Sequence, residues 1–325
     1  DVAGQLPKLA DNYLDYVFTN RAQMDVQLVQ AYWREQYANC DALDFPLKES
    51  TRSRSRGEQI VKTVDIDSAH WKRIEAFCKQ QKSSPVHFFR CLFGILIKAY
   101  CRAENDFAIA EFFAGRDSRA VMTTQGCFFQ QTPFIFKREL LGGAARFEEL
   151  LKYAREFRKD SRKYQAISMA LANRLRPAGR INFMYNYYTF YTRNEMMDGH
   201  AVSPREHPPY VEQNVQLVVK TLGDRGFLDL YFQDDNFDDR RMLERMISLS
   251  LQILDGVTDI RDLQLVLPDE HTAQLVAWNQ TAVPLPDVTS VQTMVEKQVA
   301  LTPDAIAVID DAGSLSYREL NRRAN

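Results

Sequence analysis

The stretch that decides the fold is residues 84–102, "SPVHFFRCLFGILIKAYCR". It has the pattern of a helix whose apolar residues cover nearly all sides instead of forming one stripe. A helix of this kind is normally the buried centre of a large domain. The sequence therefore predicts that the flanking segments pack around residues 84–102.

Those flanking segments alternate between helical and strand patterns. Further helices are predicted at residues 22–39, 67–81, 145–164 and 238–256, and strands at residues 59–66, 106–115, 132–140, 180–190, 215–223 and 226–235. Gly223 to Gly226 separates the last two strands and favours a hairpin turn. This pattern predicts an α/β class, an α+β two-layer sandwich in which a mixed sheet packs against helices, ending near residue 278.

The composition changes after residue 278. Residues 279–290, "NQTAVPLPDVTS", carry two prolines and several turn formers, which indicates a linker. A helix, two short strands and the start of a last helix follow in residues 291–325. Ser316 and Glu319 form the Ser-x-x-Glu pattern of a helix start, and no stop signal follows. We therefore expect residues 291–325 to be the first part of something longer.

Charge and cysteine content narrow the class of partner and compartment. The formal net charge is −2, whereas a nucleic-acid partner would require a basic surplus. No apolar run reaches the ~20 residues of a membrane span. The five cysteines are scattered and have no zinc-like spacing. We expect no nucleic-acid or membrane partner, no metal and a reducing, cytoplasmic setting.

Apart from any resemblance to a family, the sequence contains no recognisable catalytic motif. None of the five histidines has a second histidine at metal-ligand spacing, and His70 and His87 lie in helical patterns that favour packing or surface roles. His200 and His207 flank a loop, where a general base is more plausible, but neither has a partner residue, which favours a structural role. The carboxylates of residues 234–239, "DDNFDD", precede a predicted helix and are more typical of a helix start than of a cation site.

Several segments in order resemble the second half of a nonribosomal peptide synthetase condensation domain. They are "YLDYVF" (13–18), "QAYWREQY" (30–37), "FFAGRDSR" (112–119), "QGCFFQQTPFIFKR" (125–138), "INFMYNY" (181–187) and "LPDEHTAQLVAWNQTAVPLP" (267–286). The resemblance implies that residues 1–278 form the C-terminal lobe of a chloramphenicol-acetyltransferase-like fold. The family's catalytic sequence, His-His-x-x-x-Asp-Gly, is expected upstream of Asp1, so that no catalytic residue is expected in this chain.

The tail, residues 294–325, resembles the start of an adenylation domain, with "LSYREL" as its first core motif. On this resemblance, residues 291–325 are the truncated N-terminal start of that domain. ATP and magnesium would serve only that domain. The partners implied are upstream and downstream peptidyl carrier domains, the N-terminal condensation lobe and the cognate adenylation domain of the same chain.

In this family, phosphopantetheine arms of two carrier domains enter a tunnel between two lobes, and an acceptor amine attacks a donor thioester. The resemblance implies that residues 115–127 form the tunnel floor and residues 188–210 a latch to the other lobe. No cofactor would be bound directly. The residues expected to line the tunnel and contact the arm are Arg116, Gly126, Phe128, Gln130, Gln131, Thr132, Asn182 and Tyr185.

The chain departs from the family pattern at two places. Phe129-Gln130-Gln131 stands where Val-Asn-Thr is usual, and these longer side chains would narrow or rewire the tunnel wall. "KYQAISMALANRL" (163–175) stands where a His-Gln-Asp-x-Pro-Phe-Glu motif is expected.

Core packing is expected for at least two of Phe128, Phe129 and Phe134. The alternatives are a silent docking or scaffold lobe, a starter domain that takes an acyl-CoA donor, and a free-standing acyltransferase. The adenylation-like tail counts against the free-standing acyltransferase.

Overall fold

The structure is a computed structural model of the 325-residue chain. The residues it describes are 13–14, 17–18, 25–43, 59–113, 115, 124, 126, 128–164, 169–175, 181–188, 195–197, 200–202, 215–233, 241–284, 290–311 and 313–325. The chain divides into two compact units, Asp1–Leu267 and Pro268–Asn325. Each unit is described by itself below.

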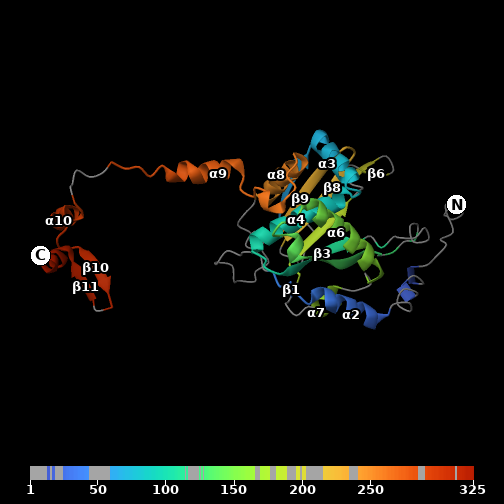
Figure 1. The fold of residues 1–325 in the computed structure, drawn as a ribbon, viewed down its shortest axis with the longest axis horizontal. Coiled ribbons are helices and arrows are strands. Elements are labelled where there is room, and N and C mark those ends of the chain that lie inside the picture. The colour runs from blue at the N-terminus through green and yellow to red at the C-terminus, as the bar shows by residue number, and fades with distance from the viewer. Residues whose placement is uncertain are drawn as a thin grey trace. The chain divides into compact units, whose positions relative to one another are not determined.

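A seven-stranded mixed sheet forms the centre of the first unit (Figure 1). Its strands are β1 (Cys40–Asp41), β2 (Gln59–Ile66), β3 (Asp106–Phe113), β4 (Gln130–Phe136), β5 (Phe183–Tyr188), β8 (Val215–Leu222) and β9 (Arg225–Gln233). The order is β1-β3-β5-β8-β9-β2, and β4 pairs with β3. The β1–β3, β3–β5 and β5–β8 pairs are parallel, and the others are antiparallel. A separate antiparallel hairpin joins β6 (Glu195–Met197) to β7 (His200–Val202).

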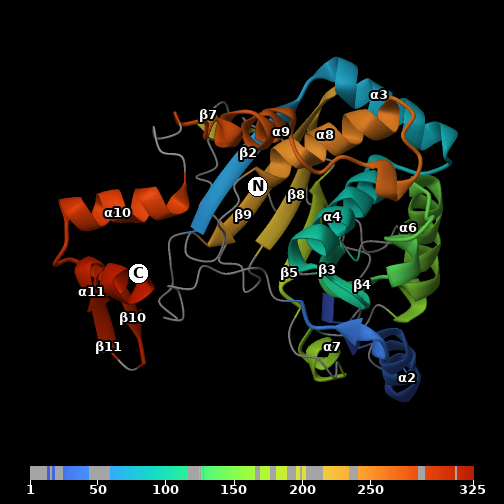
Figure 2. The same cartoon turned by 60° about the vertical axis from the view of Figure 1, so that its left-hand side comes forward.

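Helices cover one face of this sheet, as Figure 2 shows. The helices of the first unit are α2 (Val26–Tyr37), α3 (Ser68–Gln80), α4 (Pro85–Cys101), α6 (Phe147–Ser161), α7 (Met169–Leu175) and α8 (Met242–Leu254). Helices α3, α4, α6 and α8 lie over the same face, and we call the opposite face of the sheet the far face.

Helix α4 is the buried centre of the domain, as its sequence predicts. The ten residues from Phe88 to Ile97 are all buried. Gly94 lets the helix approach β4, because a Cβ atom there would overlap the ring of Phe136. The Phe93 ring lies 6.5 Å from the rings of Phe183 and Tyr185 on β5. Burial of these apolar side chains, each worth about 1.5–3 kcal/mol, makes a large contribution to the stability of the domain.

Strand register brings buried polar side chains together on the far face. Successive side chains of a strand alternate between the two faces. On β8, Val215, Leu217 and Val219 face the helices, so Gln216 and Lys220 face the other way. Both are buried, at 4% and 6% exposure. The far face is therefore a second, more polar interior surface.

The second unit contains α9 (Pro268–Leu275), α10 (Val291–Leu301), the β10–β11 hairpin and α11 (Tyr317–Ala324). The hairpin pairs β10 (Ile306–Asp310) with β11 (Gly313–Ser316). The Ser316 hydroxyl accepts a hydrogen bond from the Glu319 backbone N–H, which confirms the predicted helix start. None of the residues described in this unit is buried, and its exposed apolar side chains include Val291, Leu301 and Ile309.

The predicted fold class, α/β with a mixed sheet packed by helices, is confirmed. The strand expected at residues 132–140 begins at Gln130 and ends at Phe136, after which Arg138–Leu140 forms a 3-10 turn. The units divide after Leu267, eleven residues before the boundary expected at residue 278. The assignments of residues 279–290 and 291–325 stay predictions. Among the described residues, no helix is long and apolar enough to cross a membrane.

Candidate functional site

Three of the motif segments meet where β3 ends and β4 begins. Tyr13, from "YLDYVF", packs its ring edge-on against Phe128, with centroids 5.1 Å apart. Gly126 lies against the same tyrosine, because a Cβ atom added there would overlap the Tyr13 ring. Gly115, from the third segment, lies against the Phe128 backbone. We call these four residues the motif cluster.

Two independent features of the structure require glycine at position 115. Its φ of +64° lies in the left-handed region, which side chains with a Cβ atom adopt at a cost. A Cβ atom there would also overlap the Phe128 carbonyl oxygen. The backbone of the Gly-Arg segment can therefore lie against Phe128, just before β4, only when residue 115 lacks a side chain.

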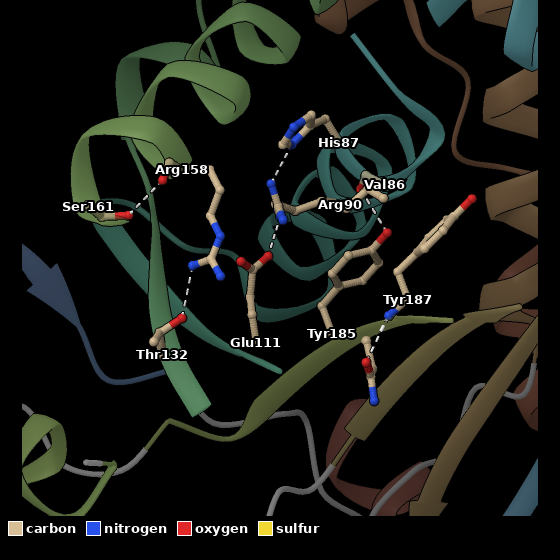
Figure 3. A network of polar contacts seen from close by, with 10 residues as sticks. Val86, His87, Arg90, Glu111, Thr132, Arg158, Ser161, Tyr185 and Tyr187 are labelled. Atoms are coloured by element: carbon tan, nitrogen blue, oxygen red, sulfur yellow. Dashed lines mark hydrogen bonds and ion pairs between the residues drawn. The ribbon is translucent and has the colours of Figure 1, made fainter. Parts of the chain in front are cut away.

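On the helix side of the sheet lies a buried network of charges (Figure 3). The Arg90 side chain, from α4, donates through Nε to the Glu111 carboxylate on β3. The two side chains are only 4% and 3% exposed. The Arg90 guanidinium also lies 4.7 Å from the centre of the Phe134 ring and 5.6 Å from that of Tyr185.

His87 extends the network one turn toward the start of α4. The Arg90 Nη1 group lies 2.6 Å from His87 Nδ1 and, being a guanidinium, donates to it. The pKa of His87 is lowered to about 3, chiefly by burial and further by the positive charges of Arg90, Arg158 and Arg155. His87 is therefore neutral at pH 7, and its remaining proton is on Nε2.

Arg158, on α6, connects the network to β4. Its Nη1 group donates to the Thr132 hydroxyl at 3.1 Å. Burial lowers the pKa of this guanidinium, while the Glu111 carboxylate opposes that shift. The Tyr185 hydroxyl donates to the Val86 carbonyl at 2.7 Å. The network thus ties α4 and α6 to strands β3, β4 and β5 (Figure 3).

The structure does not bring all the predicted tunnel residues to one surface. Thr132 and Tyr185 lie on the helix side within the charge network. Gln130 shares their side of β4, and its buried Oε1 atom has no hydrogen-bond partner among the described residues. Gln131 points to the far face and donates through Nε2 to the Met184 sulfur at 3.9 Å.

The remaining predicted tunnel residues lie toward the strand ends. Asn182, just before β5, donates to the Leu43 carbonyl at 2.9 Å. Phe128 is buried and Gly126 exposed in the motif cluster. Arg116 lies outside the described residues. The core role expected for two of three phenylalanines is confirmed for Phe128 and Phe134, while Phe129 is 58% exposed.

Sequence reasoning missed several residues of this region. Arg90 and Glu111 were not singled out, although each is a charged residue with apolar neighbours on both sides, within "FFRCLF" and "AIAEFF", which is the available signal. Asn186, the asparagine of the Phe-x-x-Asn-Tyr pattern, was also missed. It is buried on the far face, and its Nδ2 atom donates to the Tyr188 hydroxyl at 2.8 Å.

His70 has the contacts of a packing residue, as expected. Its Nε2 atom lies 2.9 Å from Ser250 Oγ, a distance typical of a serine–base pair. However, Ser250 is fully buried between α3 and α8, and its hydroxyl donates to the Ile247 carbonyl. A nucleophile in this position would have no access to a substrate. The side chains of His200 and His207 and the carboxylates of residues 234–239 lie outside the described part of the chain.

Comparison with known proteins agrees with this geometry. Residues 3–274 match the family described as Condensation domain. Bacitracin synthase 3 of Bacillus licheniformis is 23% identical over 99% of this chain and 5% of its own length. The four-domain nonribosomal peptide synthetase AB3403, solved in its holo form with AMP and glycine, superposes with a TM-score of 0.69 at 14% identity. That match covers 92% of this chain and 24% of the synthetase.

A second solved structure, the condensation domain of the monacolin K polyketide synthase MokA, has a TM-score of 0.63 at 17% identity. The match covers 78% of this chain and 64% of that protein. The chain therefore belongs to the condensation domain family of nonribosomal peptide synthetases. Its fold is the chloramphenicol-acetyltransferase-like one. The chain spans only 4 to 6% of the length of the first curated relatives that it matches.

Proposed function

We propose that this chain contributes one wall of a tunnel in which a condensation domain forms an amide bond. The donor would be an acyl or peptidyl thioester and the acceptor an aminoacyl thioester, each carried on the phosphopantetheine arm of a carrier domain. The observation that supports this most directly is the motif cluster. Tyr13, Gly115, Gly126 and Phe128 come from three family-like segments and pack together at the ends of β3 and β4.

In the proposed reaction, the acceptor amine attacks the donor carbonyl carbon. A C–N bond forms, the C–S bond breaks, and the donor arm leaves as a thiol that takes up the proton lost by the amine. Holding the amine and the thioester in attack geometry replaces a bimolecular encounter and supplies much of the rate. A histidine that orients or deprotonates the amine would come from a His-His-x-x-x-Asp-Gly sequence, which these 325 residues do not contain.

This chain's own contribution would be a rigid wall. The buried network of Arg90, Glu111 and Arg158 links two helices to β3 and β4, the strands that adjoin the Gly115 and Phe128 segments of the motif cluster. Such cross-links hold neighbouring side chains in one geometry, which catalysis by positioning requires. Residues 115–127 would form the floor of the tunnel and residues 188–210 the latch to the N-terminal lobe.

We further propose that residues 291–325 begin an adenylation domain, with residues 279–290 as the linker. The described part of the second unit has no buried residue, and its apolar side chains are exposed on both α10 and β10. Apolar residues of this number are normally covered in a stable domain. ATP and magnesium would serve that domain, and its partners would be the carrier domains and the N-terminal condensation lobe.

The test is amide formation by this chain joined to an N-terminal lobe that carries the histidine motif. Carrier domains loaded with donor and acceptor are mixed with the protein, and the carrier-bound product is measured by mass spectrometry. We expect a dipeptidyl thioester that is lost when the second motif histidine is replaced by alanine. A folded protein that binds loaded carriers but forms no product would instead identify a docking lobe.

A further inference from the structure

Gln216 presents a buried acceptor atom that no donor in the described part of the chain reaches. It lies on the far face of β8, is 4% exposed, and its side-chain Oε1 atom has no hydrogen-bond partner among the described residues. A buried polar atom without a partner costs free energy that native proteins normally avoid. This oxygen therefore points to a donor that comes from elsewhere.

Gln131 lies on the same face, three strands away, with β3 and β5 between the two glutamines. Within the described residues its Nε2 group donates to the Met184 sulfur, at 3.9 Å, and a thioether is a weak acceptor. Gln131 reaches Met184 across β3, where the intervening residue is the small Ala110. Met184 is in turn the register partner of Gln216. One glutamine donor and one glutamine acceptor thus flank the same methionine.

The neighbouring polar groups do not satisfy this pair. Lys220 and Asp229 form a buried ion pair 2.7 Å long, and the Thr63 hydroxyl donates to the same carboxylate. The Tyr231 hydroxyl lies 3.5 Å from Asp229 Oδ2 and donates toward it. The carboxylate of Asp229 is therefore already engaged.

From this arrangement we infer that Gln131 and Gln216 form a clamp for a secondary amide of the substrate chain. The Gln131 Nε2 group would donate to the amide carbonyl, and the Gln216 Oε1 atom would accept from the amide N–H. A secondary amide offers one donor and one acceptor, which matches the pair, and the Met184 thioether contacts its apolar flank. This inference rests on the proposed function, because the amide would belong to a pantetheine arm or to the donor peptide that the arm carries.

The clamp gives a physical reason for a departure in the sequence. Gln131 stands where the family usually has a short polar residue, and only a long side chain can cross Ala110 to reach Met184. The clamp is therefore a property of this chain's own residues.

The experiment is a titration of the 325-residue chain, followed by nuclear magnetic resonance, with S-acetylpantetheine as the probe. A second probe is the same compound with both amide nitrogens methylated, which removes the N–H donors. The variants are Gln131→Met and Gln216→Met, which keep side-chain length, and Gln80→Met on the exposed surface of α3 is the matched control. Replacing an unpartnered buried amide by an apolar group should leave Gln216→Met folded.

We expect the unmethylated probe to bind the wild-type chain and Gln80→Met equally, and each clamp variant about fivefold more weakly. The methylated probe should bind wild type and Gln216→Met with the same affinity. Equal affinity of the unmethylated probe for wild type and Gln216→Met, or no binding to wild type, would overturn the clamp. Amide formation is not measured here, so a clamp that binds in a protein without condensation activity would refute only the proposed function.

Discussion

Arg90 on α4 and Glu111 on β3 form an ion pair that is almost completely removed from water. Removing one partner of such a pair leaves an uncompensated buried charge, which costs far more than the pair contributes. We expect Glu111→Gln to lower the free energy of unfolding by about 3 kcal/mol, measured by urea denaturation.

The control for Glu111→Gln is the exposed pair of Arg73 and Asp255, whose side chains are 47% and 65% exposed. Asp255→Asn should change the free energy of unfolding by less than about 1 kcal/mol. Equal effects of the two substitutions would mean that the Arg90–Glu111 pair is not buried as described.

The lowered pKa of His87 should make the stability of the chain depend on pH. Its pKa in the folded chain is about 3, below the ordinary value of 6.5, chiefly because of burial. The unfolded chain therefore binds more protons below pH 6.5, and stability falls as the pH drops, by up to about 1.4 kcal/mol per pH unit for this group. The pKa of His70 is lowered by burial too, so it acts in the same direction.

Urea denaturation between pH 6.5 and pH 4.5 checks this expectation. His87→Asn should reduce the slope of stability against pH relative to wild type. His271→Asn, at an exposed position, is the matched control and should leave the slope unchanged. A His87→Asn slope equal to that of wild type would show that His87 titrates normally in the folded chain.

Gly115 and Gly143 have nearly the same backbone conformation but different surroundings, so Gly143 is a matched control for a substitution at Gly115. Their φ angles are +64° and +65°, but a Cβ atom at Gly143 would meet open space, whereas at Gly115 it would overlap the Phe128 carbonyl. We expect Gly143→Ala to cost about 1 kcal/mol, from backbone strain alone. Gly115→Ala should cost at least about 2 kcal/mol more, because the start of β4 must shift. Equal losses of stability for Gly115→Ala and Gly143→Ala, measured by thermal or urea denaturation, would mean that the motif cluster is not packed as described.

Trp278 offers a test of the proposed junction with an adenylation domain. Trp278 is 69% exposed, so Trp278→Ala should leave the stability of this chain nearly unchanged. In a protein that includes the adenylation domain, we expect faster protease cleavage across residues 279–290, because an aromatic side chain beside a linker usually anchors it. Cleavage at the wild-type rate would count against that role.

The elements with a strong local pattern could be predicted from the sequence. Residues 84–102 are apolar on nearly all sides, and residues 59–66 alternate between apolar and polar side chains. These two segments form the expected helix and strand. Helices α7 and α9 were missed, since they have only seven and eight residues and a weak apolar period.

The candidate site was harder to predict, because it depends on how elements cross. Arg90 and Glu111 are 21 positions apart and meet only because α4 lies over β3. Thr132 and Gln131 are adjacent in sequence, yet strand alternation directs them to opposite faces of the sheet. A motif match predicts which residues belong to a region, whereas the direction of each side chain follows from strand register.

The most direct test of the central claim compares the 325-residue chain alone with the same chain joined to an N-terminal lobe that carries the histidine motif. Both are incubated with loaded donor and acceptor carrier domains, and the dipeptidyl thioester is measured by mass spectrometry. We predict product from the joined protein and none above background from the chain alone. Product formed by the chain alone would show that these residues hold a complete active site and would contradict the proposal that they supply only one wall of it.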